Sequence, residues 1–330
     1  MTIGQSPNLA YPTIADRAAS GKQARKLCPR DSHCEWKPSQ RKLDPLTLLA
    51  EQATTRVSEL VPIRYGRMAA TPFSYFRGAA LPMAADLATF SRTGIDVQLC
   101  GDAHLSNFGG FASPERDLVF DVNDFDETHP GPFEWDVKRF AASLEIAGRS
   151  REFDAATNRR IVLQGVRTYR ETVRWFSQQH QLDIWYATLD EAGVLALWGN
   201  DIGKAALTAL AKAVTRASSK DHLKARSKLT RVVNGQLEFL SFPPLLVPIE
   251  DLFSDPQEAD MLEDTISSAL ETYRLTLSSD RRALLNTFHY VATARKVVGV
   301  GSVGMRCWLA LFIGGDINDP LILQIKQAEE

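Results

Sequence analysis

The sequence has little cysteine, no long hydrophobic run and no excess of one charge. Its four cysteines form neither a paired framework nor a CxxC ligand pair, which argues against a disulfide scaffold and favours a reducing compartment. The most apolar run, CWLALFI, is far too short to cross a bilayer, and no apolar signal segment opens the chain. The formal net charge of -2 gives no global basic field for nucleic acid. We therefore expect a cytoplasmic protein without nucleic-acid or membrane partners, in which any anion site is local.

Apolar residues make up 44% of the 330 positions, enough for a chain of this length to bury a full core. We expect three parts. Residues 1–43 are polar with little periodicity and are expected to form a loosely ordered arm. Residues 44–220 hold helices and two polar motifs. Residues 221–330 hold a hairpin, a helix and a glycine-rich group of strands.

Several segments have clear secondary-structure signatures. Asp44 and Pro45 are typical of the N-cap and first position of a helix, which we expect to end before Pro62. Asn234 and Gly235 can supply the two positive φ values of a tight hairpin turn. We further expect helices over 80–90, 134–149, much of 151–220 and from 260 onward, and strands over 94–100, 117–122 and the segments that flank the glycines near the end.

Two loops after strands are unusually polar. CGDAHLSNFGG carries Asp102, His104 and Asn107, and VFDVNDFDE carries Asp124 and Asp126. Such residues can simply cap a tight turn. Phosphoryl transfer from a nucleotide, however, needs a carboxylate near the acceptor hydroxyl and hard oxygen ligands for magnesium. The first loop can supply the carboxylate and an amide oxygen, and the second can complete a metal site.

GDAHLSN resembles the catalytic loop of aminoglycoside phosphotransferases and other protein-kinase-like enzymes. The resemblance implies that Asp102 is the catalytic carboxylate, that His104 orients the loop and that Asn107 binds metal. In that superfamily a metal-binding Asp follows on a short strand, and twelve residues later another Asp braces the catalytic loop. Asp124 and Asp136 have this separation, so Asp124 is preferred over Asp121, with Asp126 kept as a further metal candidate.

Near the end, GVGSVG places Gly299, Gly301 and Gly304 in a GxGxxG pattern. The strand-like sequence that follows does not fit a Rossmann unit, in which a helix comes next. A strand, a glycine loop, a strand and a lysine-bearing strand form the phosphate-covering device of protein kinases. Lys326 in LQIK resembles that lysine, and an ordinary hairpin ending in an exposed lysine is the alternative. The sequence does not identify a carboxylate that pairs with Lys326.

In ordinary kinases the glycine loop precedes the catalytic loop, whereas here it follows by about two hundred residues. A circular permutation would explain this order. Through RYGRMAATPFSYFRGAA and ARKVVGVGSVGMRCWLALF, the sequence also resembles the bacterial domain-of-unknown-function 2252 family, which is grouped with protein-kinase-like folds. The resemblance implies a helix-rich α+β, two-lobed and permuted kinase-like fold with small antiparallel sheets. Members of that family continue past LQIK, so we expect the lobe of residues 221–330 to be incomplete.

The leading functional hypothesis is an ATP- and magnesium-dependent phosphotransferase. Its partners would be the nucleotide and an unidentified hydroxyl-bearing acceptor, either a small molecule or a protein. Arg77 is a further candidate for the phosphates, whereas Arg64 and Arg67 could equally form structural ion pairs. Nucleotidyl transfer by the same site, a nucleotide-binding pseudokinase or regulatory module, and a metal-dependent phosphoesterase are the alternatives.

Overall fold

The computed structural model describes residues 12–198 and 227–328, together with the single positions 203, 207, 208, 211, 212, 214 and 215. It is an α+β structure with small antiparallel sheets, which confirms the expected class. The chain divides into two compact units. Unit 1 comprises Met1–Leu49 and Thr71–Leu197, and unit 2 comprises Ala50–Ala70 and Trp198–Glu330. The part of the predicted helices of 151–220 that follows Trp198 lies largely outside the described residues.

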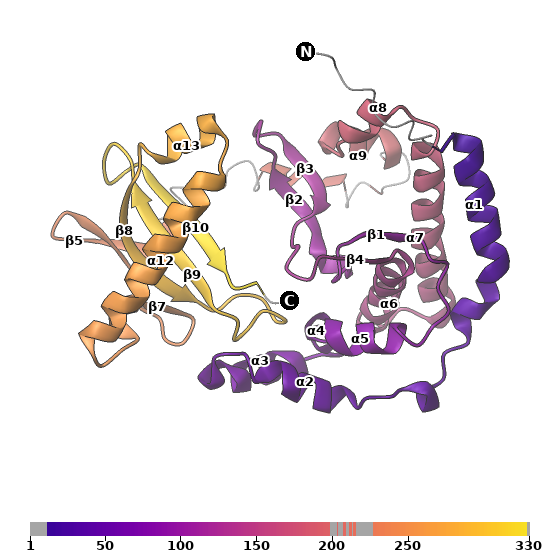
Figure 1. Ribbon diagram of the computed structural model, residues 1–330, viewed down its shortest axis with the longest axis horizontal. Helices are drawn as coiled ribbons and strands as arrows, with labels where there is room; N and C mark the ends of the chain where they lie inside the picture. Colours follow the sequence, from indigo (N-terminus) through magenta and orange to yellow (C-terminus); the bar gives the residue numbers. More distant parts are fainter. Residues whose placement is uncertain are drawn as a thin grey trace, which may run out of the picture. The chain divides into compact units, whose positions relative to one another are not determined.

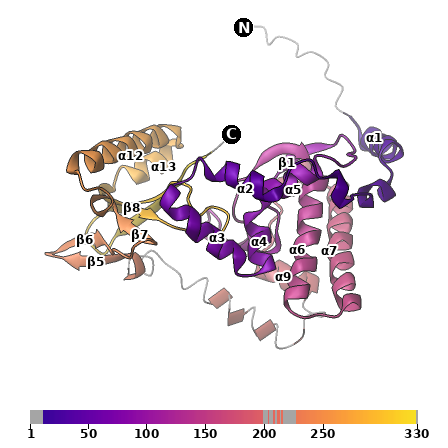
Figure 2. The ribbon, with the colours of Figure 1, turned by 90° about the horizontal axis from the view of Figure 1, so that it is seen from below.

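Unit 1 is centred on two long helices, α6 (Glu134–Ser150) and α7 (Ala155–Phe176), which lie side by side (Figures 1 and 2). Asp154 caps α7 by accepting the Thr157 backbone N–H. Around this pair lie the shorter helices α1 (Ile14–Leu27), α4 (Pro72–Gly78), α5 (Ala80–Leu87), α8 (Gln181–Trp185) and α9 (Glu191–Trp198), with the 3-10 turns η1 (Arg30–Cys34) and η2 (Pro38–Gln40).

Two segments differ from the sequence expectation. Within residues 1–43, expected to be loosely ordered, helix α1 forms behind a capping box in which Thr13 and Asp16 satisfy each other's backbone N–H groups. The single helix expected after Asp44 is divided into α2 (Pro45–Ala53) and α3 (Val61–Ala69). Asp44 caps α2 as expected, but Pro62 lies in the first turn of α3, because proline fits a helix start as well as a helix end.

The strands of unit 1 form two small antiparallel ladders. Strand β1 (Asp96–Leu99) pairs with β4 (His129–Pro132), and β2 (Phe108–Ala112) forms a hairpin with β3 (Leu118–Val122). The strands expected over 94–100 and 117–122 are therefore confirmed, whereas β2 and β4 were not expected. Both polar loops begin where one of these strands ends.

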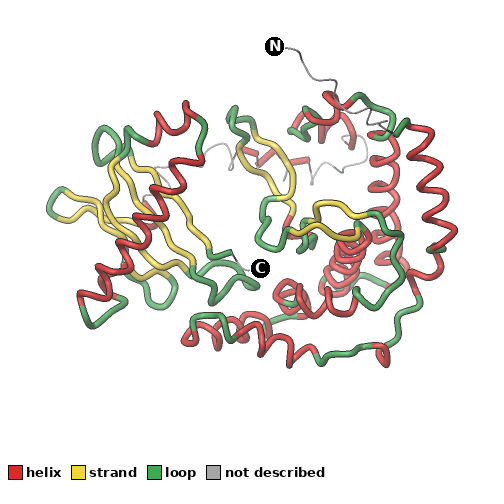
Figure 3. Tube along the Cα trace, viewed as in Figure 1, coloured by secondary structure: helices red, strands yellow, loops and turns green. Residues whose placement is uncertain are grey.

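Unit 2 is built on an antiparallel sheet in the order β10-β9-β8-β7. Figure 3 shows its strands in yellow, and Figure 1 shows helix α12 crossing one face. Ile266 and Leu270 of α12 pack there on Ala310 and Phe312, while Leu237 and its neighbours on β6 cover the other face. The elements are β5 (Thr230–Val233), β6 (Gln236–Phe239), β7 (Leu246–Pro248), η5 (Ile249–Asp251), α12 (Pro256–Thr276), α13 (Ser279–Leu285), β8 (His289–Lys296), β9 (Cys307–Ile313) and β10 (Pro320–Lys326).

The hairpin of β5 and β6 turns at Asn234 and Gly235, whose φ values of 50° and 81° confirm the predicted tight turn.

Residues 50–70 were expected to belong with the polar motifs to the part 44–220, but they belong to unit 2. They contribute η3 (Ser58–Leu60) and α3, and Leu60 is buried there against Val297 and Val303. This hydrophobic contact explains why residues 50–70 pack with unit 2.

No helix in the described part of the chain is both long and apolar enough to span a membrane. None of Cys28, Cys34, Cys100 and Cys307, all of which the structure describes, takes part in a disulfide.

Candidate functional site

The loop between β1 and β2 is held in place by the first turn of α6. The carboxylate of Asp136 accepts the backbone N–H groups of Cys100 at 2.7 Å and Gly101 at 3.1 Å. Gly101 has φ of +79°, and a Cβ there would lie 1.9 Å from the carbonyl oxygen of Glu127, so only glycine fits. Burial raises the pKa of Asp136, and the two N–H donors act against that shift. These are the contacts that a brace of this loop would make.

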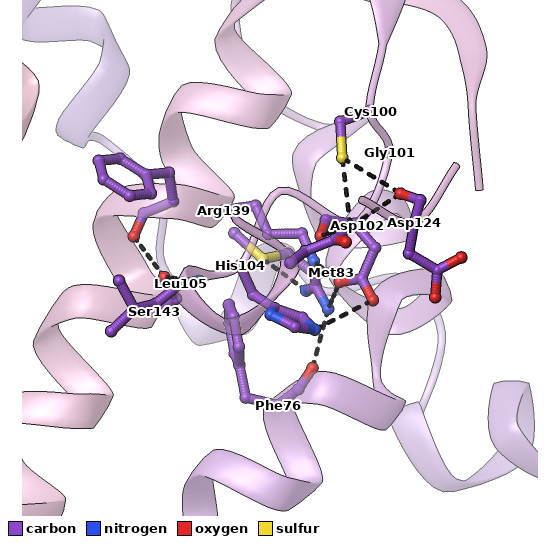
Figure 4. A network of polar contacts seen from close by, with 12 residues as sticks. Phe76, Met83, Cys100, Gly101, Asp102, His104, Leu105, Asp124, Arg139 and Ser143 are labelled. Carbon is purple, nitrogen blue, oxygen red and sulfur yellow. Dashed lines mark hydrogen bonds and ion pairs between the residues drawn. The ribbon is translucent and has the colours of Figure 1, made fainter. Parts of the chain in front are cut away.

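The carboxylate of Asp102 is bound by a buried arginine, Arg139 of α6 (Figure 4). Arg139 Nε donates to Asp102 Oδ1 at 2.5 Å, and its side chain is only 3% exposed. The remaining donors reach the carbonyl oxygen of Phe76 and the sulfur of Met83. The guanidinium also stacks over the Phe76 ring. Asp102 is 21% exposed, so one side of the carboxylate is held by Arg139 while the group remains accessible.

His104 lies beneath the same carboxylate. Its Nε2 is 3.5 Å from Asp102 Oδ2, and the ring is buried against Phe73. Burial lowers the pKa of His104, and the nearby Arg77 and Arg139 add to this, while Asp102 opposes it. His104 is therefore neutral at neutral pH, and its contact with Asp102 is a polar contact rather than an ion pair.

Asn107, the last residue of the loop before β2, is buried. Its Nδ2 donates to the backbone carbonyl oxygens of Asp102 and Asp124, each at 3.0 Å. Since carbonyl oxygens only accept, these two contacts fix which end of the amide is Nδ2. Among the described residues no donor reaches Asn107 Oδ1, although the atom is buried. A buried acceptor without a partner is costly, and a cation would satisfy it.

The hairpin register explains why Asn107 and Asp124 meet. Phe108 pairs with Val122, so the residues just outside this pair lie side by side, and Asn123 donates its backbone N–H to the Asn107 carbonyl. Asp124 follows at once and is exposed, as is Asp126 in the next turn. Asp121 lies within β3 and its carboxylate accepts the Val122 N–H. The structure thus brings Asp124 to Asn107 and leaves Asp121 on the strand.

The described residues contain no cluster of three or more His, Cys, Asp or Glu side chains suited to a metal. Asn107 and Asp124 can offer an amide oxygen and a carboxylate. Magnesium in nucleotide sites takes one or two protein carboxylates and completes its shell with phosphate oxygens and water. The two oxygen ligands that Asn107 and Asp124 can offer, together with the lack of a hydrogen-bond donor at Asn107 Oδ1, fit this pattern.

Arg77, at the end of α4, is the cation that the sequence proposed for this region. It is half-buried, its charge acts on His104, and within the described chain no acceptor reaches its Nε. It therefore lies in the electrostatic environment of the Asp102 loop.

The glycine segment and Lys326 belong to unit 2. Residues 297–306 join β8 to β9, and β10 pairs with β9 so that Lys326 is opposite Cys307, at the end of the sheet that carries this loop. The predicted succession of strand, glycine turn, strand and lysine-bearing strand is confirmed. Leu323 and Ile325 face α12, so strand alternation puts Lys326 on the opposite face. Helix α12 therefore lies across the sheet from Lys326.

The three glycines have different environments. Gly299 is exposed, Gly301 is half-buried, and Gly304 is buried beneath Arg56, where its φ is +90° and a Cβ would lie 3.1 Å from the Arg56 Cβ. Close approach of Arg56 therefore requires glycine at 304.

Sequence reasoning missed Arg139, Ser143 and Arg56. The Ser143 hydroxyl accepts the Leu105 N–H beneath the loop. A spacing signal existed for Arg139 and Ser143, because Asp136, Arg139 and Ser143 lie at helical intervals on one face of α6. No sequence signal linked Arg56 to a segment more than two hundred residues away.

Residues 56–330 match the sequence model of a bacterial protein family, which is described as "Uncharacterized protein conserved in bacteria (DUF2252)". No curated protein and no solved structure matches the chain.

Proposed function

We propose that this chain, which belongs to the bacterial DUF2252 family by its match over residues 56–330, is an ATP- and magnesium-dependent phosphotransferase acting on a hydroxyl-bearing acceptor. The proposal includes a protein-kinase-like fold in permuted order and a cytoplasmic location, where ATP is available. The acceptor is either a small molecule or a protein.

One observation carries the proposal: Nδ2 contacts to two backbone carbonyls lock the Asn107 side chain, and its buried Oδ1 has no donor among the described residues. The two carbonyl groups belong to Asp102 and Asp124. Asn107 and Asp124 would hold the magnesium ion, whose chemical contribution is to neutralise charge on the phosphate oxygens.

The residues of the loop suit transfer to a hydroxyl. Asp102 Oδ2 accepts the proton of the acceptor hydroxyl while Arg139 holds Oδ1. The acceptor oxygen forms a bond to the γ-phosphorus, the bond from that phosphorus to the β,γ-bridging oxygen breaks, and ADP leaves with the electron pair. His104 supports the carboxylate from below, and Asp136 holds the loop backbone.

Strand pairing supports the kinase-like part of the proposal. The Asp102 loop follows β1, the β2–β3 hairpin connects it to Asp124, and β4 returns to pair with β1. In unit 2 the glycine segment joins two antiparallel strands and Lys326 is on the third. Within unit 2, the proposal gives Gly299, Gly301 and Gly304 the role of covering phosphates and Lys326 that of a positive charge for them. Within unit 1, it gives Arg77 the role of a positive charge near the Asp102 loop.

The test is a calorimetric titration of ATP into the full chain with magnesium and with EDTA. The D124N variant should lose the magnesium-dependent part of the affinity, by about tenfold or more, which corresponds to about 1.4 kcal/mol. The matched control is D121N, which removes the same charge from the same hairpin at a position on the strand. D121N should bind within about twofold of the wild type.

Three results would contradict the proposal: no ATP binding by the wild type, magnesium-dependent binding that persists in D124N, or an equal loss in D121N. Product analysis then separates the alternatives. Release of ADP with a phosphorylated acceptor supports phosphotransfer, and release of pyrophosphate with a nucleotidylated acceptor supports nucleotidyl transfer. Binding without turnover over a panel of acceptors would favour the pseudokinase or regulatory hypothesis.

A further inference from the structure

The side of helix α7 that lies away from α6 is formed by arginines. Asn158 and Gly165 mark the side that packs on α6, because the Asn158 amide donates to a carbonyl oxygen of α6 at 3.0 Å and a Cβ at Gly165 would lie 2.7 Å from an α6 side chain. Residues two positions further along a helix lie about 200° away. Arg160 and Arg167 therefore lie opposite α6, and Arg174 follows at the same seven-residue spacing (Figure 2 shows the two helices).

Two more arginines extend this row. At about 100° per residue, all the arginines of α7 fall within about 100° around the helix axis, and all are exposed. Glu171 is the only acidic residue of α7. In the described part of the chain, its exposed contact with Arg170 at 3.4 Å is the one ion pair that these arginines make. The basic face of α7 is formed by Arg159, Arg160, Arg167, Arg170 and Arg174.

A row of charges of one sign is unusual for a helix face that contacts only water. Solvated faces alternate acidic and basic residues, whereas Arg170 and Arg174 lie four residues apart and place like charges side by side, which lowers helix stability. The net charge of -2 averages over the whole chain and does not describe this local face. A partner with negative charges would remove the repulsion between the arginines.

Apolar side chains are exposed beside the basic face. Leu163 and Trp175 lie on the same outward half of α7 and are 52% and 57% exposed. Helix α8 begins shortly after α7 ends, and Leu182, Trp185 and Tyr186 have the spacing of one helix face. Trp185 is 81% exposed. Exposed aromatic and leucine side chains next to basic residues are typical of helices that bind at a bilayer surface.

We propose that the basic face of α7 binds the surface of an anionic phospholipid bilayer, and that α8 places Trp185 in the headgroup region. The row from Arg160 to Arg174 is about 21 Å long, and a bilayer surface is flat over that length. The arginines bind the lipid phosphates, while Leu163 and Trp175 lie at the apolar boundary. This surface goes beyond the proposed function, because the Asp102 loop is held by α6 rather than α7.

A nucleic-acid duplex is the other partner with a regular array of phosphates. The parts of a duplex that such a row of arginines would contact are sugars and phosphates, which give Leu163 and Leu182 no apolar surface to pack on. A bilayer takes up both the positive charge and the exposed apolar groups. The exposed side chains beside the basic face therefore favour lipid over nucleic acid.

The experiment is co-sedimentation of the full chain with lipid vesicles at low salt. The probe is phosphatidylcholine vesicles with about 30% phosphatidylglycerol, an anionic lipid, and vesicles of phosphatidylcholine alone are the reference. The wild type should bind only the anionic vesicles, and about 0.5 M salt should weaken binding about tenfold or more because of screening. R160Q/R167Q/R174Q should weaken binding about fiftyfold or more, since each basic residue at an anionic surface contributes about fivefold.

Two further variants separate charge from apolar insertion. R160K/R167K/R174K should bind within about threefold of the wild type, because attraction to a lipid surface needs the charge rather than the guanidinium fork. W185S should weaken binding about fivefold or more, by the same factor at low and at high salt, because burial of apolar surface is not screened. W185S that binds as the wild type does overturns the role of α8.

The matched control is R231Q/R281Q/R306Q, which removes three exposed arginines from unit 2 and should bind within about twofold of the wild type, because those charges do not lie on the basic face. Thermal unfolding of every variant identifies any loss of fold. If R160Q/R167Q/R174Q unfolds, R167Q alone provides the test, with an expected loss of about fivefold.

Four results would overturn the inference: no binding to anionic vesicles, equal binding by the glutamine variant and the wild type, an equal loss in the control, or binding of a mixed-sequence DNA duplex through these arginines without vesicle binding. The last result would assign the basic face to nucleic acid. Magnesium-dependent ATP binding should be unchanged in the α7 variants, because Asn107 and Asp124 are not on that helix. Lack of ATP binding by the wild type contradicts the proposed function alone.

Discussion

The guanidinium of Arg139 binds the carboxylate of Asp102, with Nε 2.5 Å from Oδ1. The pair joins the β1–β2 loop to α6, and Arg139 also reaches the carbonyl of Phe76 on α4. With Met83 of α5, which it also contacts, four elements of unit 1 therefore meet at one buried arginine. Because an unpaired buried charge is costly, the position of Asp102 is coupled to the packing of α6.

We expect R139M to lower the free energy of unfolding by about 3 kcal/mol, at the low end for a broken buried pair because Asp102 is partly exposed. Urea unfolding of R139M, D102N and the double variant measures this. The double variant should be less destabilised than the sum of the single variants by about 1 kcal/mol or more. Additive effects within about 0.5 kcal/mol would show that the contact does not couple the two residues.

We expect G101A to be far more destabilising than G94A. Both glycines have positive φ, 79° at Gly101 and 76° at Gly94, so alanine is strained at either position. Only at Gly101 would the new Cβ collide with the Glu127 carbonyl, whereas nothing lies within 4 Å at Gly94. Thermal unfolding of the two variants isolates the collision. G101A should lose at least about 2 kcal/mol more than G94A, in the range for a steric clash in a well-packed site, and equal losses would contradict the fixed loop geometry.

We expect the Cys100 thiol to resist alkylation at pH 8. Burial first, and then the neighbouring carboxylate of Asp136, raise the pKa of Cys100 to about 11, so little thiolate is present at that pH. Cys34 is exposed and serves as the internal control. Mass spectrometry after timed treatment with iodoacetamide should find Cys34 modified well before Cys100, with Cys100 reacting only as the pH approaches its pKa. Equal rates at pH 8 would show that Cys100 is not shielded in this way.

We expect His104 to make the protein less stable in mild acid. In the folded state, burial lowers the pKa of His104 below its ordinary value of 6.5. The unfolded chain therefore binds the proton more readily than the folded chain. The free energy of unfolding falls as the pH drops from about 6.5 toward the lowered pKa. H104Q removes the titrating group. Melting temperatures measured between pH 7.5 and pH 5 should decline more steeply for the wild type than for H104Q. A steeper decline in H104Q would mean that His104 is not the group responsible.

Local features of the fold were predictable because they depend on neighbouring residues. The N-cap at Asp44 and the turn at Asn234 and Gly235 follow from local hydrogen bonding and allowed φ values. The same local reasoning misplaced the helix boundary at Pro62, since proline is compatible with either helix terminus, and α1 was not expected in a polar segment with weak periodicity.

The sequence by itself determined which residue types fall in the two polar loops, their spacing and the succession of strands around the glycines. These are properties of short segments. Only the tertiary structure decided that Asn107 Oδ1 is left without a donor in the described chain and that Arg139 binds Asp102. Spacing had already favoured Asp124 over Asp121, and the structure adds the contact of Asn107 with the Asp124 carbonyl. It also assigned Arg67 and Arg56 to the glycine segment. Such pairings depend on hairpin register and on burial of Leu60 against Val303, which involve residues far apart in the chain and leave no local signal.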